Sequence, residues 1–229
     1  MTTDGLVSLS YDGALLCHLE TALPHLEEVG LKATFYCEPA LLLENLPEWA
    51  HVLASGHELA NGALHGAVME DGSLPGWTLQ MVREDVIEAK ALLEDLFPEQ
   101  PDHSFGFPWG KALSDGTDVT SAAQDVYPVV RLGEHGVNKA PWEPRRLNCV
   151  QCDDLDSSEL IAIAKQALEP GTWVVFAFEG VGAGDRAVDA AAHRDLCLFL
   201  ANEPRLTVLP VCDVATSLAS LRAQAYKLV

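Results

Sequence analysis

Segments with the pattern of a β-strand alternate with segments with the pattern of an α-helix along the whole chain. The apolar run "LVSLSYD" is followed by the helix-like "HLETALPHLEEVG", which ends at Gly30, and then by the β-rich "LKATFYC". Such alternation over 229 residues predicts βα units around a parallel sheet, in a single domain covering residues 1–229. The regular spacing favours a closed barrel, and an open doubly wound sheet is the alternative.

The charge balance argues against two classes of partner. The chain carries 14 Lys and Arg against 34 Asp and Glu, a formal net charge of -20, and the acids are spread through helix-like segments such as "REDVIEAKALLEDLF". We therefore expect neither nucleic acid nor a membrane as a partner. A neutral or cationic small-molecule substrate is compatible with this charge.

The N-terminus and the cysteines bear on the compartment of the protein. The stretch "MTTDGLVSLS" lacks the basic region of a signal peptide, and the apolar runs of the chain are shorter than a membrane span. The six cysteines lie mostly in apolar stretches, which is typical of reduced thiols in a protein core. We expect a cytoplasmic protein.

Polar residues stand where the predicted strands end. In a parallel α/β fold, the carboxyl ends of the strands meet on one side of the molecule, and functional sites form there. Each such residue alone is more often a surface or capping residue, so it is their shared position that predicts a site. The residues at these ends are Asp12, Asn61, His65, Trp109, Arg131, Asp153, Asp154 and Glu179.

Five segments carry a resemblance to a known family. The segments "SLSYDG", "ALPHLEEVGLKATFYCEPALL", "GHELANGALHG", "FGFPWG" and "WVVFAFEGVG" resemble, in order and spacing, the motifs of the polysaccharide deacetylases, carbohydrate esterase family 4. The resemblance covers most of the chain. It implies a distorted (β/α) barrel of about seven strands. The usual chemistry of the family is metal-dependent removal of an acetyl group from an amide or ester.

The chain departs from this family at the metal ligands. At the family's Thr-Phe-Asp-Asp-Gly motif, Asp12 matches the general base, whereas Gly13 takes the place of a metal-binding Asp. At the motif with two metal-binding histidines, Gly62 takes the place of the first and His65 matches the second. The resemblance therefore implies that one metal ligand remains of the usual three.

Two further family positions are also changed. Gly106 takes the place of an Arg in the third motif, and Glu179 aligns with the His that acts as general acid. Proton-transfer capacity at the acid position is thus kept as a carboxyl. A carboxyl donates a proton at neutral pH only if burial or a like charge raises its pKa, and Asp12 facing Glu179 across a pocket would do so.

These residues predict acid–base chemistry without a cofactor. A catalytic zinc normally needs three protein ligands and an open position, which His65 and two glycines do not supply. We therefore predict a metal-independent enzyme that acts on a soluble small molecule by isomerisation, elimination, cyclisation or C–N hydrolysis. The predicted catalytic residues are Asp12, Glu179 and His65, and the predicted substrate-binding residues are Tyr11, Asn61, Trp109 and Arg131.

Alternatives remain open for the site. Asp12, His65 and Glu179 could form a remodelled site for zinc or another divalent metal, as in a metal-dependent deacetylase or amidohydrolase. The chain could also be a pseudoenzyme that binds a carbohydrate or metabolite, although the ionisable Glu179 at the acid position argues against simple decay. Arg131 would stabilise an oxyanion if it points inward, and would form a surface ion pair otherwise.

Overall fold

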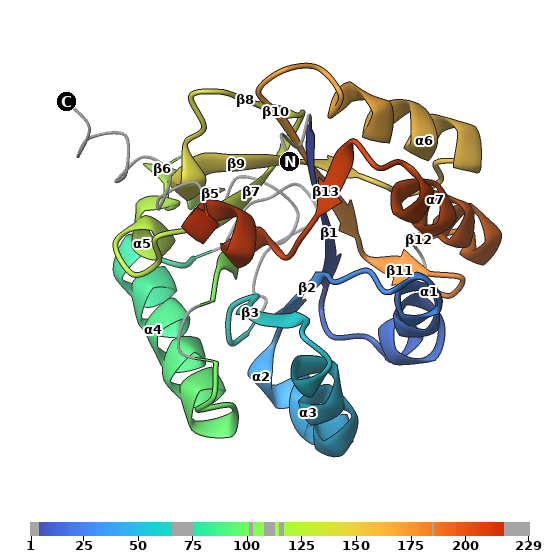
Figure 1. Ribbon diagram of the computed structural model, residues 1–229. Coiled ribbons are helices and arrows are strands. Elements are labelled where there is room, and N and C mark those ends of the chain that lie inside the picture. Colours follow the sequence, from blue (N-terminus) through green and yellow to red (C-terminus); the bar gives the residue numbers. More distant parts are fainter. Residues whose placement is uncertain are drawn as a thin grey trace.

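A closed barrel of parallel strands forms the centre of the molecule (Figure 1). The computed structural model describes residues 5–65, 76–100, 103–107, 113–114, 117–184 and 186–217. Strand β10 pairs back with β1 in parallel, so the sheet closes on itself. The predicted barrel of seven strands is confirmed, and the open sheet is excluded. In barrel order the strands are β1 (Gly5–Asp12), β2 (Thr34–Cys37), β3 (Glu58–Asn61), β4 (Phe105–Gly106), β7 (Val130–His135), β9 (Leu147–Gln151) and β10 (Thr172–Phe178).

Short strands extend the edges of this barrel. Strand β13 (Leu206–Val208) pairs in parallel with β1, and β8 (Asn138–Lys139) pairs antiparallel with β10. Two small separate sheets are formed by β5 (Leu113–Ser114) with β6 (Thr117–Asp118) and by β11 (Gly180–Val181) with β12 (Ala187–Val188). The pairing of β7 with β9 shifts register between Arg131 and His135, so the barrel is distorted.

The helices surround the barrel on its outside (Figure 1). Local capping signals set one end of three of them. Gly30 ends α1 in the left-handed conformation, the Thr78 hydroxyl accepts the Met81 N–H at the start of α4, and Asp156 forms a capping box with Glu159 in α6. The helices are α1 (Leu23–Val29), which follows a π-helical turn (His18–Ala22), α2 (Pro39–Leu42), α3 (Leu46–Ala54), α4 (Leu79–Leu96), α5 (Ser121–Gln124), α6 (Ser157–Gln166) and α7 (Ala190–Asn202), with 3-10 turns at Leu43–Asn45 and Pro144–Arg146.

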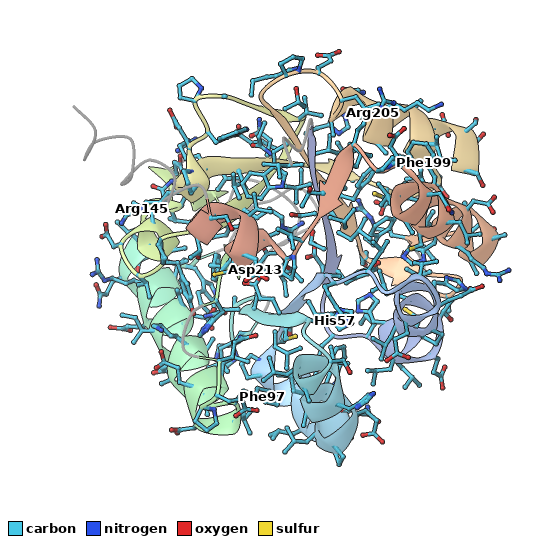
Figure 2. The ribbon with its side chains drawn as sticks, in the orientation of Figure 1. His57, Phe97, Arg145, Phe199, Arg205 and Asp213 are labelled. Atoms are coloured by element: carbon cyan, nitrogen blue, oxygen red, sulfur yellow. The ribbon has the colours of Figure 1, made fainter. Side chains whose placement is uncertain are left out.

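Successive residues of a barrel strand point alternately toward the surrounding helices and toward the barrel interior. On β1, Tyr11 faces outward, because its ring stacks with Phe35 and Phe178 and its hydroxyl reaches His193 of α7. Asp12 faces the other way, toward Arg131 of β7. Figure 2 shows side chains filling the space between strands and helices, with Arg145 and Arg205 on the periphery. The apolar core thus lies between barrel and helices, while charged groups enter the barrel interior.

Some predicted elements are shorter than the sequence suggested. The pattern of "HSFGFPWG" predicts a fourth strand, and among its described residues Phe105–Gly106 form one; Trp109 lies outside the described residues. The segment "VTSAAQDVY", whose sequence pattern predicts a longer helix, forms the four-residue helix α5. Among the described residues, the structure contains no helix that is both long and apolar enough to cross a membrane.

Candidate active site

A cavity of about 160 Å³ opens at the carboxyl ends of the barrel strands. Its lining comes from the ends of β1, β2, β3, β4, β9 and β10 and from the segments that follow them. This is where functional groups gather in parallel α/β barrels. The lining residues are Asp12, Gly13, Leu15, Tyr36, Glu38, Leu41, Gly62, Gly106, Gln151 and Glu179.

Asp12 is held in the cavity wall by a buried arginine. The Nη2 of Arg131 donates to Oδ1 of Asp12 at 2.6 Å, and Arg131 is fully buried. Among the described residues, no hydrogen bond reaches the other oxygen, Oδ2. Burial raises the pKa of Asp12 above its ordinary value, and Arg131 partly offsets this rise. The carboxylate is thus oriented by one oxygen and more basic than an exposed aspartate.

The Tyr36 ring packs against the arginine of this ion pair. The guanidinium of Arg131 lies over the Tyr36 ring, 4.5 Å from its centre. The same ring occupies the space beside Gly106, where an added Cβ would lie 2.7 Å from ring carbons. The Ser104 hydroxyl donates to the Tyr36 hydroxyl at 3.1 Å, which fixes the ring at its far end. The absence of a side chain at Gly106 therefore leaves room for the Tyr36 ring, on which Arg131 stacks.

Glu179 forms another wall of the cavity. It follows β10, and its Oε2 lies 3.3 Å from Nε of Arg186, which also binds Asp153. The backbone carbonyl of Glu179 accepts the Nε2–H of buried His18 at 2.6 Å. The proton of the neutral ring lies on Nε2, because the Leu15 N–H donates to Nδ1. Burial lowers the pKa of His18 to about 4, so the ring is neutral at pH 7. A neutral histidine thus ties the segment after Asp12 to the end of β10.

Glu38 is a cavity carboxyl that the strand-end analysis missed. It follows β2 directly and stands at the N-cap of α2, but its side chain does not cap the helix. Within the described part of the chain, no ion pair or side-chain hydrogen bond is made by this carboxyl. An acid between the end of a strand and Pro39 is the same signal that pointed to Asp12, so the sequence could have revealed it.

The predicted residues fall into two groups. Asp12 and Glu179 line the cavity together, whereas Tyr11, Asn61, His65 and Arg131 are not among the described lining residues. Tyr11 donates to or accepts from Nε2 of His193 at 2.7 Å, and the Asn61 amide donates to the Tyr127 hydroxyl at 2.8 Å. Tyr11 and Asn61 thus join the barrel to its helices, and their role in substrate binding stays a prediction.

His65 and Arg131 take positions different from those expected. The His65 side chain is 61 % exposed and lies beside Asp85, with its Nε2 4.0 Å from Oδ1. Arg131 forms neither a surface pair nor a direct wall of the cavity, because it lies buried behind Asp12. Trp109, the remaining predicted substrate-binding residue, lies outside the described residues.

The residues present do not fit a metal centre of the family type. Among the described residues, no group of three His, Cys, Asp or Glu side chains is placed to hold a metal ion. Gly13 has φ +94°, which a residue with a side chain rarely adopts, and a Cβ at Gly62 would lie 3.1 Å from the Tyr36 carbonyl carbon. A side chain at either glycine would therefore be strained or tightly packed against the backbone.

Solved structures resemble this fold over nearly the whole chain. A Mycobacterium smegmatis protein whose assignment as a polysaccharide deacetylase is provisional matches with a TM-score of 0.72 and 12% identity, over 97% of this chain and 92% of that one. The chain has the fold of the polysaccharide deacetylases. The family 4 domain of a multidomain xylanase, from the hindgut metagenome of Trinervitermes trinervoides, matches with a TM-score of 0.64 and 15% identity, over 94% of this chain and 91% of that one.

Pseudoenzymes are also among the structural matches. A variant of a family 4 pseudoenzyme from Bacillus anthracis, with restored enzymatic activity, matches with a TM-score of 0.62 and 16% identity, over 94% of this chain and 69% of that one. No family model and no curated protein sequence matches the chain. The resemblance predicted from the sequence is therefore confirmed at the level of the fold.

Proposed function

We propose that the protein is a divergent relative of the polysaccharide deacetylases that catalyses proton transfer on a small molecule without a metal. The observation that carries this proposal is the Asp12 carboxylate, oriented by buried Arg131 and exposed to a cavity at the catalytic end of the barrel. Glycines at the positions of two family ligands support metal independence, because their backbone leaves no ready place for ligating side chains. A compartment in the cytoplasm agrees with the reduced cysteines.

Each cavity residue has a defined task in this proposal. Asp12 takes a proton from the substrate through Oδ2, while Arg131 keeps the carboxyl ionised and in place. The electron pair left on the substrate forms a new double bond, closes a ring or expels a leaving group. Glu179, across the cavity and beside Arg186, relays a proton from solvent to the atom that gains charge. This sequence covers isomerisation, elimination and cyclisation, whereas unactivated amide hydrolysis would lack the Lewis acid that lowers its barrier.

Deuterium exchange tests the proposal with a panel of compounds instead of a single chosen substrate. The protein is incubated in heavy water with small neutral and cationic compounds, and mass spectrometry detects deuterium incorporation or conversion. We expect wild-type protein to label or convert at least one compound and Asp12→Asn to lose this activity by roughly a hundredfold or more. The control is Asp154→Asn, since Asp154 is an exposed acid outside the cavity lining. Equal activity of Asp12→Asn and wild type would overturn the proposal.

A second candidate is a binding protein without catalysis. It is favoured by one observation, namely that Asp12 and Glu179 each contact an arginine, as structural carboxylates do. In this case a compound would bind the cavity, and Asp12→Asn would change its affinity, but neither exchange nor conversion would occur. The same panel therefore separates the two candidates.

A further inference from the structure

The carboxyls of the cavity differ in their charge partners. Asp12 is paired with Arg131 at 2.6 Å, and Glu179 lies 3.3 Å from Arg186. Glu38 has neither an arginine nor a lysine as a partner within the described part of the chain. Asp12 and Glu179 are therefore each neutralised in part by an arginine. The negative charge of Glu38 has no such arginine or lysine within the described part of the chain.

The surroundings of Glu38 add negative charge. Asp85 of α4 is 7% exposed, and its Oδ1 is buried without a hydrogen-bond partner, although His65 lies 4.0 Å away. Burial and the Asp85 carboxylate raise the pKa of Glu38, and His65 partly offsets this rise. A positive charge placed next to Glu38 would offset the desolvation cost of this carboxyl and its repulsion by Asp85.

The remaining wall suits a small organic cation. Leu15, Leu41 and the Tyr36 ring supply apolar surface beside the carboxyls. The volume of about 160 Å³ holds roughly five water-sized groups. A hydrated metal ion would leave the apolar wall without a partner, whereas an alkylated ammonium group would contact both the wall and the carboxylate.

From this arrangement we propose that Glu38 is the specificity-determining residue of the cavity and that it selects a small organic cation of the alkylammonium class. The proposal rests on the proposed function, in that the cation would be the substrate on which Asp12 acts. A positive group in contact with Glu38 would also acidify the neighbouring C–H bonds and so assist proton removal by Asp12.

A pair of ligands with the same shape and different charge tests this proposal. Tetramethylammonium and tert-butanol have the same number of non-hydrogen atoms, and their affinities are measured by proton NMR titration of the wild-type protein. We expect the cation to bind roughly tenfold or more tightly than the alcohol. Equal affinities, or no binding of tetramethylammonium, would overturn the proposal without the need for any variant.

Variants then assign the selectivity to one carboxyl. Glu38→Gln keeps the shape of the side chain and should lower tetramethylammonium affinity roughly tenfold while leaving tert-butanol unchanged. The control is Glu44→Gln, because Glu44 is an exposed acid in the same segment and outside the cavity lining. Undiminished cation binding by Glu38→Gln contradicts the assignment. If this variant does not fold, Glu38→Ala, which also removes the charge, provides the comparison.

The outcome is separable from that of the proposed function. Charge-selective binding that depends on Glu38, together with unchanged exchange in Asp12→Asn, would support the specificity and overturn the catalysis. Asp12-dependent exchange on neutral compounds, with no effect of Glu38→Gln, would support the catalysis and overturn the specificity.

Discussion

The ion pair between Asp12 and Arg131 should behave as a coupled unit in folding. Arg131→Met keeps a side chain of similar length and removes the charge, so Asp12, with its side chain 18% exposed, loses the cation that faces it. Breaking a buried pair by removing one partner costs about 3 to 5 kcal/mol. Because Asp12 keeps some contact with solvent, we expect about 3 kcal/mol for Arg131→Met. Asp12→Asn should cost a similar amount, because Arg131 is fully buried and is left without its carboxylate.

A double-mutant cycle measures this coupling. The double variant has neither charge, so its cost should be smaller than the sum of the single costs by about 2 kcal/mol. Urea unfolding of the four proteins at pH 7 gives the free energies.

The pH dependence supplies an internal check. Arg131 lowers the pKa of Asp12, so its removal raises that pKa further above the unfolded value. A carboxyl with a raised folded pKa loses stability as pH rises through that pKa, so Arg131→Met should be less destabilised at pH 4 than at pH 7. If the cost of the double variant equals the sum of the two single costs within about 0.5 kcal/mol, Asp12 and Arg131 are not coupled. A cost of Arg131→Met below about 1 kcal/mol would refute the coupling as well.

Three further predictions concern the glycines and the buried histidine. Gly106→Ala should destabilise the protein by about 1 to 3 kcal/mol in urea unfolding, since the new methyl group meets the Tyr36 ring at 2.7 Å, and a neutral effect would show that the ring can move. Gly13→Asp combined with Gly62→His should cost at least about 2 kcal/mol and bind zinc no better than wild type in equilibrium dialysis; tight stoichiometric binding would contradict the backbone argument. The pKa of His18 is lowered from 6.5 to about 4, so the unfolded state binds a proton at a higher pH than the folded state does. The free energy of unfolding should therefore fall by about 3 kcal/mol as the pH drops from 6.5 to about 4. His18→Gln should flatten that part of the stability curve, and an unchanged slope would assign it to other groups.

The fold was predictable because it depends on local pattern. Alternation of strand-like and helix-like segments indicates βα units, and the end signals at Gly30 and Thr78 lie where the helices end and begin. Within its described residues the fourth strand is shorter than expected, because an apolar run alone does not show how many of its residues find a paired neighbour. Of "HSFGFPWG", two residues pair in the described structure.

The candidate site was predictable only in part. Asp12 and Glu179 stand at strand ends, and the barrel brings them to one cavity. The role of Arg131 could not be read locally, because its partner Asp12 lies 119 residues away in sequence. His65 follows the expected strand, but Ala63 has φ +76°, and after that turn the His65 side chain is exposed outside the described cavity lining. Motif spacing does not encode this change of direction.

The most direct test combines exchange with metal analysis on one preparation. Deuterium exchange on an active compound is measured for wild type and Asp12→Asn before and after dialysis against a chelator, with metal content determined by elemental analysis. We predict that the chelator leaves the wild-type rate unchanged and that Asp12→Asn abolishes it. A rate that disappears with the chelator and returns with added zinc would contradict metal-independent catalysis by Asp12.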